Sequence, residues 1–287
     1  MLAYWVHDLE PVIYQITEKL AVRWYGLSYV TGFLIAFALL GLYWKRGRSV
    51  LDPRMQENLA VALILGVLIG GRVGYFLLYE TVNLLRDPLV LFRVWEGGMA
   101  SHGGFAGVAV AILWISRKNR LPSLKLGDLI ASVAPPGLLL GRIANFVNGE
   151  LWGKVSQVPW AVIFPKSAPA GTPVSLISPR HPSQLYEAVL EGLVLLLYMQ
   201  YRFWRVKGRK EATLAAADPP ARPGHLTGEF LVVYSLARCI GEVFREPDAS
   251  LILGLNRGIF YSILLLLVGL ALIAWIRVQP LTNRKRA

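Results

Sequence analysis

The segment Leu126–Gly153 reads LGDLIASVAPPGLLLGRIANFVNGELWG, and its first part is almost entirely apolar. Arg142 stands near the end of this apolar stretch, and the carboxylate of Glu150 follows shortly after it. An arginine inside a membrane helix costs roughly 3 kcal/mol or more, so it is seldom present without a use. The segment therefore indicates a helical membrane protein, and Arg142 is the first candidate for a polar, anion-handling site.

The composition supports a polytopic membrane protein. Hydrophobic residues make up 55% of the chain and charged residues only 17%, and the mean hydropathy is +0.48. The net charge of +12 is explained by cytoplasmic loops and contact with anionic lipids, and no nucleic-acid motif accompanies it. A single cysteine, Cys239, excludes an intramolecular disulfide and a cysteine metal cluster. We expect neither a metal nor another cofactor.

Seven apolar segments are long enough to cross or nearly cross a bilayer, which takes about 20 residues. They lie at about 22–44, 57–79, 97–116, 126–147, 183–204, 227–246 and 257–277. The predicted fold is therefore all-α, with about seven transmembrane helices in one integral domain, residues 1–287. The Met1–Glu18 stretch carries acidic residues and no lysine or arginine, so we do not expect it to be a signal peptide.

Basic runs predict the orientation of these helices. They follow the odd-numbered segments, at 45–48, 117–120, 202–210 and 284–286, whereas the loops on the other side are poorer in lysine and arginine. The positive-inside rule then places the N-terminus outside and the C-terminus in the cytoplasm.

The two long outer loops have different characters. Residues 80–96 contain Phe92 and Trp95, which predicts an amphipathic arm in the membrane interface. Residues 148–182 are rich in proline, which predicts a small head outside the membrane with turns and short strands. Small residues recur at four-residue spacing, which is typical of closely packed helices. They are Gly66, Gly70 and Gly74 in one segment and Gly103 and Gly107 in the next.

This topology brings polar residues from separate helices to one half of the membrane. These residues are Tyr25, His102, Arg142, Asn145, Arg238 and Arg245. Polar residues with unrelated structural roles would not be expected to gather in this way. The pattern therefore favours one functional site, and the inner half, poor in polar residues, favours chemistry from one side.

Several of these residues also have purely structural interpretations. Arg142 could extend its side chain to the outer headgroups. Arg238, Glu242 and Arg245 share one helical face and could form an ion-pair ladder. A single histidine such as His102 is often structural, and we do not expect Cys239 to be catalytic. Glu187 could pair with a neighbouring arginine or cap a helix.

Five separated motifs, in order, resemble the bacterial prolipoprotein diacylglyceryl transferase family. They are Ser101-His102-Gly103-Gly104, Gly141 to Asn145, Asn148 to Gly153, His181 to Glu187, and Arg238 to Asp248. The resemblance extends from Arg23-Trp24-Tyr25-Gly26 to about residue 254. The chain departs from the family at Ala144, where glycine is usual, and at Leu255–Phe260, where a Met-Gly-Gln-like stretch is usual.

The resemblance implies an enzyme of the bacterial inner membrane whose active site faces the periplasm. It would move the diacylglyceryl group of phosphatidylglycerol to the lipobox cysteine thiol in the signal peptide of a preprolipoprotein. The products would be a thioether-linked lipid and glycerol phosphate. Membrane lipids would be its other contacts, and we expect a monomer with no nucleic-acid partner.

The resemblance also suggests roles for the polar residues. His102 would be the general base, although an arginine with a hydroxide, or a lipid oxygen, could take the proton instead. Arg142 and Arg238 would bind the phosphate and stabilise the leaving group. Glu242 would orient an arginine, and Arg245 would be a lesser phosphate contact. Further substrate-binding positions are Tyr25, Asn145 and Glu150, which would hydrogen-bond the headgroup or hold the arginines, and Gly103, Gly104, Gly149 and Gly153, which would give room for lipid and peptide.

Two other classes of function fit parts of the pattern. Intramembrane arginines and a helix broken near Pro135-Pro136 also occur in transporters of anionic solutes. A transporter needs access from both sides, however, and the sequence contains no inverted repeat. A lipid-binding scaffold without turnover would tolerate loss of His102 but not of the packing glycines.

Overall fold

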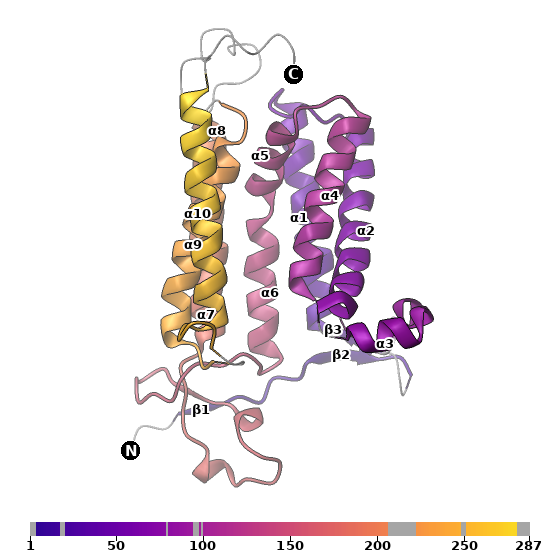
Figure 1. Ribbon diagram of the computed structural model, residues 1–287. Helices are drawn as coiled ribbons and strands as arrows, with labels where there is room; N and C mark the ends of the chain where they lie inside the picture. Colours follow the sequence, from indigo (N-terminus) through magenta and orange to yellow (C-terminus); the bar gives the residue numbers. More distant parts are fainter. Residues whose placement is uncertain are drawn as a thin grey trace. The chain divides into compact units, whose positions relative to one another are not determined.

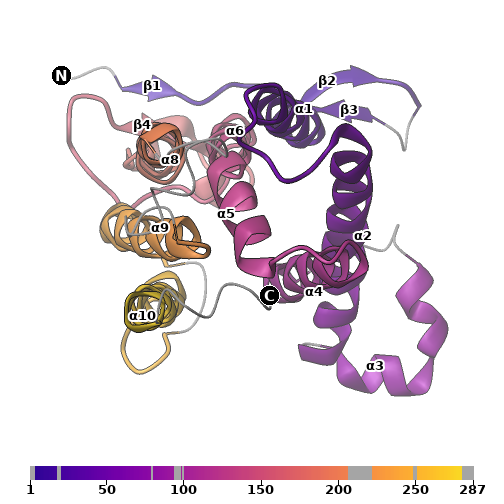
Figure 2. The same cartoon turned by 90° about the horizontal axis from the view of Figure 1, so that it is seen from above.

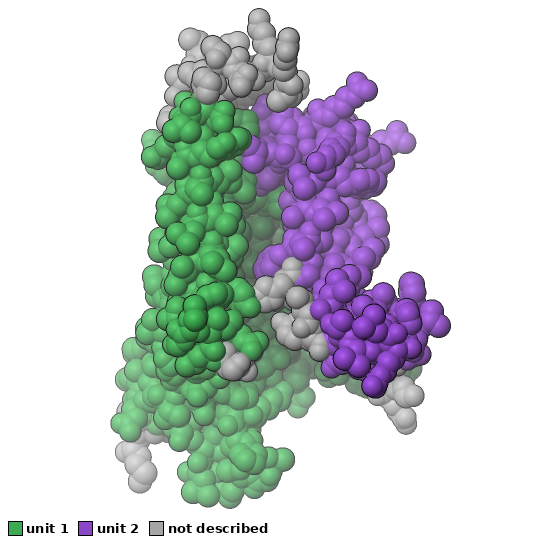
Figure 3. Space-filling model, in the orientation of Figure 1, with its two compact units in different colours: residues 1–39, 130–286 green, residues 40–129, 287 purple. Residues whose placement is uncertain are grey.

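The computed structural model describes the backbone of residues 4–17, 21–78, 80–93, 98, 100–205, 222–247 and 251–279, without the side chains of Leu78, Ser101 and His102. These residues form two compact units, shown in Figure 3. Unit 1 joins the chain before residue 40 to the chain from residue 130 onward, and unit 2 is residues 40–129. Whether the chain is one folding domain stays a prediction.

Helices lie over all seven predicted apolar segments (Figure 1). They are α1 (Trp24–Lys45), α2 (Pro53–Leu78), α4 (Ser101–Lys118), α5 (Ser123–Val133) with α6 (Pro135–Val147), α7 (Ser183–Glu187) continued by the π-helical η5 (Ala188–Val194) and α8 (Leu195–Arg205), α9 (His225–Phe244) and α10 (Arg257–Val278). The predicted helical fold is confirmed, with boundaries shifted by a few residues. The remaining elements are short.

Length and composition alone make α1, α2 and α10 candidate membrane spans. The pair α5–α6 would be a fourth, bent by 40°. Pro135 and Pro136 open α6 at this bend, where their missing N–H groups leave no helical hydrogen bond unmade. Seven crossings, and their direction, stay predictions.

Unit 1 holds most of the polar residues singled out by the sequence. Figure 2 shows α9 lying between α8 and α10. Gly228 on α9 and Gly269 on α10 bring these helices close, because a Cβ atom on Gly269 would lie 2.9 Å from the Gly228 oxygen. The helices α6 and α9 end, and α7 and α10 begin, at the same end of the unit (Figure 1).

The predicted head lies beside this end of unit 1 and consists of turns, short 3-10 helices and one short strand. It contains β4 (Val162–Ile163), η3 (Pro165–Ser167) and η4 (Val174–Leu176). β1 (Trp5–Val6) pairs in parallel with β4 and ties the start of the chain to the head. β2 (Val12–Gln15) and β3 (Ala21–Arg23) form an antiparallel pair that leads directly into α1.

His7 fastens β1 and the head to α6. Its ring nitrogen Nε2 lies 2.7 Å from the Phe146 carbonyl oxygen, and its ring packs against those of Phe146 and Phe164. Gly149, just after α6, has a φ of +60°, and a Cβ atom there would lie 3.0 Å from the His7 ring. The end of α6 is therefore held by the head.

Unit 2 is built on a tight seam between α2 and α4. A Cβ atom on Gly66 would lie 2.6 Å from the Gly107 oxygen, and one on Gly74 would lie 2.5 Å from the Gly103 Cα. The backbones thus touch where the glycines face each other, as the sequence predicted. This contact depends on van der Waals packing, which is the main attraction between helices in lipid.

The predicted arm contains α3 (Thr81–Arg86) and η1 (Pro88–Phe92), with exposed apolar side chains such as Leu85 and Phe92. Arg72 on α2 holds it, donating to the carbonyls of Val90 and Arg93, each at 2.6 Å, and to that of Leu91 at 3.1 Å. The predicted Trp95 lies outside the described residues. Location of the arm in the membrane interface stays a prediction.

The seam gives a first testable prediction. In Gly107→Ala, the added methyl would overlap the Gly66 carbonyl, so α2 and α4 must separate. We expect a loss of about 1–3 kcal/mol in unfolding free energy, the usual cost of overpacking. Denaturant or thermal unfolding in detergent measures it. Gly41→Ala is the matched control because a Cβ atom there has nothing within 4 Å. Equal stability of the two variants would contradict the seam.

Candidate active site

Two glutamates form the centre of a buried ionic cluster in unit 1. Glu187 ends α7 and Glu191 lies in η5, and the side chains of both are 0% exposed. π-Helical turns inside α-helices are rare and occur frequently at functional sites. A buried carboxylate is tolerated only when cations or donors surround it. The partners of these glutamates therefore locate the site.

Arg142, near the end of α6, contacts both glutamates. One terminal guanidinium nitrogen lies 2.9 Å from Oε2 of Glu187. The other lies 2.9 Å from Oε2 of Glu191, and Nε lies 3.2 Å from the same oxygen. Its side chain is only 17% exposed, so it points into unit 1 and does not extend to a lipid headgroup as the structural alternative proposed.

Arg238 on α9 contacts the same two carboxylates from the other side. Its NH1 atom lies 2.8 Å from Oε1 of Glu187 and 3.1 Å from Oε1 of Glu191. Each glutamate thus uses Oε1 for Arg238 and Oε2 for Arg142. The two carboxylates therefore fix the positions of the two guanidinium groups relative to each other.

Glu242 and Arg245 extend the cluster along α9. Glu242 pairs with Arg238 one turn away, and its Oε1 lies 3.9 Å from Nε of Arg245. Arg245, just after α9, also reaches Glu187 at 3.5 Å. The ladder that the sequence suggested is present, and it is joined to α6 and η5 through the glutamate pair. Counting Arg142, the cluster holds three arginines and three glutamates.

Three glycines make room for the carboxylates. A Cβ atom on Gly192 would lie 2.5 Å from the Leu139 Cα, so η5 lies directly against α6. One on Gly241 would lie 3.1 Å from Cγ of Glu187. One on Gly258, in the first turn of α10, would overlap the carboxylate of Glu242. Close approach of these backbones is therefore what lets the glutamates reach the arginines.

The atypical stretch Leu255–Phe260, which runs into the first turn of α10, belongs to this same arrangement. Asn256 precedes the helix, and its side-chain amide donates to Oε2 of Glu242 at 3.5 Å. Together with Gly258, it places the start of α10 on Glu242. The departure from the family pattern therefore lies against an ion pair of the cluster.

Glu150 forms a second polar group beyond the end of α6. Its Oε1 accepts from Asn145 at 2.8 Å and from Asn148 at 3.2 Å. The Gln184 amide donates to the Glu150 carbonyl at 2.6 Å, which ties the loop to α7. Leu151 follows with a φ of +58°, a conformation that only a well-held loop imposes on leucine.

Tyr25 lies in the first turn of α1, with Tyr29 one turn later. The Tyr29 hydroxyl donates to the Tyr25 hydroxyl at 3.2 Å, and their rings are 5.1 Å apart. Tyr29 lies within electrostatic range of both Arg142 and Glu150. The predicted Tyr25 therefore belongs to a tyrosine pair beside the polar residues of α6.

Gly153 has a packing role in the loop after α6. Its N–H donates to the His181 carbonyl at 2.9 Å, and a Cβ atom would lie 2.6 Å from the oxygens of His181 and Phe244. Gly153 thus lies between His181 of the head and the end of α9, with no space for a side chain. Burial, and then the charge of Lys154, lower the pKa of His181, whose Nδ1 lies 3.1 Å from the Tyr186 hydroxyl.

The predicted His102, Gly103 and Gly104 lie in the first turn of α4, in unit 2. The side chain of His102 lies outside the described residues. Gly103 packs against α2, whereas a Cβ atom on Gly104 would only touch Val67 at 4.0 Å. Of the predicted set, unit 1 therefore brings together Arg142, Arg238, Glu242 and Arg245, with Tyr25, Asn145, Glu150 and Gly153 at the same end.

Sequence reasoning gave Glu187 only a minor place and missed Glu191 and Tyr29. A signal for the glutamates was available, because Glu187 directly precedes the hydrophobic stretch from Ala188 to Met199 and Glu191 interrupts it four residues later. Acidic residues inside an apolar span are as costly as the arginine that was noticed. The same argument would have found Arg72 of unit 2.

The space at Gly258 gives a second testable prediction. In Gly258→Ala, the methyl would displace Glu242 from Arg238, which leaves a buried charge short of its partner. We expect unfolding free energy to fall by about 3 kcal/mol or more, as when a buried pair is broken. Unfolding in detergent measures it, with Gly137→Ala of α6 as control because a Cβ atom there meets nothing within 4 Å. A variant as stable as the control would contradict this account of Gly258.

Known proteins resemble this chain over almost its full length. A sequence model of the family described as prolipoprotein diacylglyceryl transferase matches residues 11–275. The phosphatidylglycerol–prolipoprotein diacylglyceryl transferase of Zymomonas mobilis is 42% identical over 277 residues, which is 96% of this chain and 88% of that protein. The protein of the same name from Ruegeria pomeroyi is 43% identical, over 85% of this chain and 83% of its own. That from Vibrio cholerae is 40% identical, over 93% and 92%.

The matched residues include α6, α7, η5 and α9, which supply the ionic cluster. The sequence resemblance is thus confirmed over the elements that build the candidate site. This chain belongs to the prolipoprotein diacylglyceryl transferase family.

Proposed function

We propose that this chain transfers the diacylglyceryl group of phosphatidylglycerol to the lipobox cysteine thiol of a preprolipoprotein. The names of its relatives support this reaction. The observation that carries it is the pair of buried arginines, Arg142 and Arg238, held at one end of unit 1 by shared carboxylates. Such fixed cations suit a substrate whose phosphate gains charge.

The reaction needs groups that stabilise the negative charge on the departing phosphate, and a base that accepts the thiol proton. The thiol sulfur bonds to the glycerol carbon of the diacylglyceryl group, and the bond from that carbon to the phosphate oxygen breaks. The phosphodiester carries one negative charge, and the departing glycerol phosphate carries a second as the bond breaks. The thiol proton passes to a base. Positioned guanidinium groups stabilise the developing charge best where water is excluded.

The roles follow from this requirement. Arg142 and Arg238 bind the phosphate, and Arg245 is a lesser contact at the edge of the cluster. Glu242 orients Arg238, with which it is paired. Tyr25, Asn145 and Glu150 serve the headgroup glycerol or hold the loop beside it. Gly104 gives room for lipid and peptide, whereas the space at Gly103 and Gly153 is filled by neighbouring backbone, so these two glycines serve packing.

His102 is the proposed base. A neutral imidazole takes a proton readily near neutral pH, and the unperturbed pKa of a cysteine thiol is about 8.5, so most of the thiol needs help to ionise. His102 stands in the first turn of α4, next to the packing glycines that fix this helix on α2. A helix start that packs against a neighbouring helix is a suitable place for a base that must meet a bound thiol.

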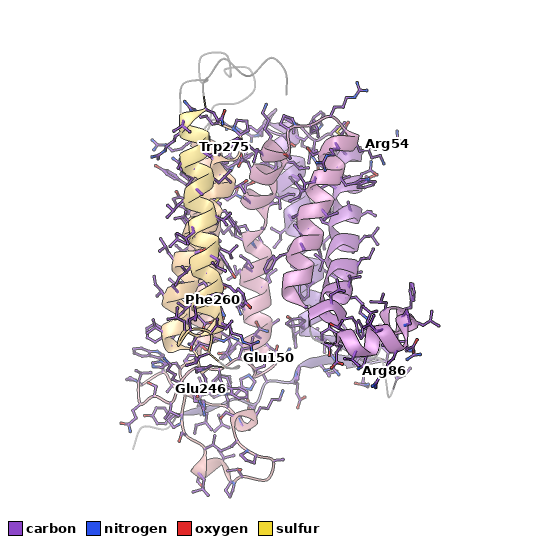
Figure 4. All side chains as sticks on the ribbon, viewed as in Figure 1. Arg54, Arg86, Glu150, Glu246, Phe260 and Trp275 are labelled. Atoms are coloured by element: carbon purple, nitrogen blue, oxygen red, sulfur yellow. The ribbon has the colours of Figure 1, made fainter. Side chains whose placement is uncertain are left out.

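The proposal includes a membrane arrangement. The seven helical segments cross the inner membrane with the N-terminus outside and the C-terminus in the cytoplasm. Figure 4 labels Glu150, Glu246 and Phe260 at the end of unit 1 that carries the cluster, and Trp275 at the opposite end. The first end would face the periplasm. The head lies outside the membrane, the arm lies in the interface, and the enzyme acts as a monomer.

A direct assay tests the function. Purified protein in detergent is incubated with phosphatidylglycerol and a fluorescent lipobox peptide, with a Cys→Ala peptide as control. We expect a diacylglyceryl mass gain on the cysteine peptide alone, together with release of glycerol phosphate. No gain from folded protein under several lipid and detergent conditions would refute the transferase proposal and favour a flux assay for anion transport.

The arginines give a third prediction. Arg142→Gln and Arg238→Gln remove a donor to the developing charge, so kcat should fall by about 10²-fold or more. Lysine at either position should not restore it, because an ammonium cannot bridge two carboxylates and a phosphate in the same plane. Arg202→Gln is the matched control, since Arg202 is also ion-paired, at 2.5 Å to Glu229, towards the other end of α9. Intact turnover of both cluster variants would disprove the anion-binding role.

The base gives a fourth prediction. In His102→Gln, kcat at pH 7 should fall by about 10²-fold or more, the usual contribution of a general base. Activity should recover partly as the pH approaches the thiol's own pKa, because the peptide then ionises without help. Turnover is measured from pH 6 to about pH 9. Near-normal turnover of His102→Gln at pH 7 would mean that another group takes the proton, while the transferase proposal would stand.

A further inference from the structure

The proposed roles leave Glu187 and Glu191 without a function in the reaction. Both side chains are fully buried and cannot touch a substrate in this arrangement. Any effect they have on chemistry must pass through Arg142 and Arg238. This inference rests on the proposed function, because it concerns how that site handles its phosphate.

The geometry of the pair restricts the arginines strongly. Because each carboxylate contacts both guanidinium groups through separate oxygens, neither arginine can turn without breaking contacts to Glu187 and Glu191 together. The arginine side chains are still 17% and 11% exposed. A guanidinium has five N–H groups, so donors beyond those in the ion pairs remain for a phosphate. The glutamates thus hold two partly accessible donors at a fixed spacing.

The charges of the cluster matter as much as its geometry. Three arginines alone would bind a dianionic phosphate tightly in a site with little water. Tight binding of the product does not accelerate the chemical step, and it delays release. Among the described residues, the three glutamates balance the three arginines, so this set has no net charge before substrate arrives. Donors are therefore in place for the transition state, but the departing anion meets a neutral site.

We propose that Glu187 and Glu191 are positioning residues that fix the spacing of Arg142 and Arg238 and neutralise them. Their geometry supports the chemical step, and their charge allows glycerol phosphate to leave. The two effects separate in experiment, because one substitution can remove the charge and another can keep the charge but change the reach.

Glu191→Gln removes the charge and nearly keeps the shape. We expect kcat to fall and glycerol phosphate to become a stronger inhibitor, with its inhibition constant lower by about tenfold or more. Inorganic phosphate should also bind more tightly in calorimetry. Glu229→Gln is the matched control. This substitution also breaks an ion pair to an arginine in unit 1, because Oε2 of Glu229 lies 2.9 Å from Nε of Arg202. Glu229 lies about 14 Å along α9 from Arg238.

Glu191→Asp keeps the charge but shortens the side chain by one methylene, about 1.5 Å. It cannot reach both arginines as Glu191 does. We expect kcat to fall while the inhibition constant for glycerol phosphate stays within about twofold of the wild type, since the cluster remains neutral. A purely structural role would lower stability and active fraction in both variants without this split.

Size-exclusion profiles and thermal unfolding in detergent identify the folded variants. If Glu191→Gln does not fold, Glu187→Gln replaces it, because Glu187 bridges the same two arginines. The inference is overturned if folded charge-removing variants keep wild-type kcat and phosphate affinity, or change no more than Glu229→Gln. Failure of the proposed function is a separate result. It would appear as absent transfer by the wild type, and the ratio of phosphate affinities would still decide the inference.

Discussion

The candidate site depends on two carboxylates that no solvent reaches. Glu187 and Glu191 each join Arg142 of α6 to Arg238 of α9. A buried charge without a partner costs several kcal/mol, so these four residues must be present together. The ion pairs therefore do more than connect α6 and α9 through α7 and η5. They make the position of each guanidinium depend on the others, which is what a site for a developing phosphate charge requires.

Packing elsewhere in unit 1 allows the glutamates to reach the arginines. Gly192 lets η5 lie against α6, and Gly241 leaves space for Glu187 beneath α9. The π-helical turn places Glu191 beside the same two arginines that Glu187 contacts. His7 and the loop around Gly153 then fix the ends of α6 and α9. Small residues and backbone contacts thus supply a geometry that the charged side chains alone could not maintain.

Balanced charge gives this arrangement a particular character. A set of bare arginines would favour any anion, including the product, whereas paired arginines keep their direction and lose much of their general attraction. Bare arginines would provide affinity for anions, whereas paired arginines provide donors that are already oriented. Catalysis benefits from the oriented donors. A different ion pair lies at the other end of unit 1, where Glu229 contacts Arg202 at 2.5 Å and His225 at 3.2 Å, and joins α8 to α9 without bridging two arginines among the described residues.

The helices were predictable because hydropathy is a local property of the chain. The seven apolar segments, the glycine seam of α2 and α4, and the shared face of Arg238 and Glu242 all follow from residue type and spacing. The motifs also indicated the family. The division into two units did not follow from this pattern, since it depends on how helices from distant parts of the chain pack together.

The sequence by itself determined which residues are costly in a membrane and therefore need partners, namely Arg142, Arg238 and Glu191. Only the tertiary structure decided which partner each one has. Arg142 and Glu191 are 49 positions apart, and nothing in their spacing indicates that they meet. Their contact depends on the bend before α6, the glycine at residue 192 and the π-helical turn of η5 acting together. Pairing of buried charges is a long-range property, because the desolvation cost of each is offset only by groups that folding brings to it.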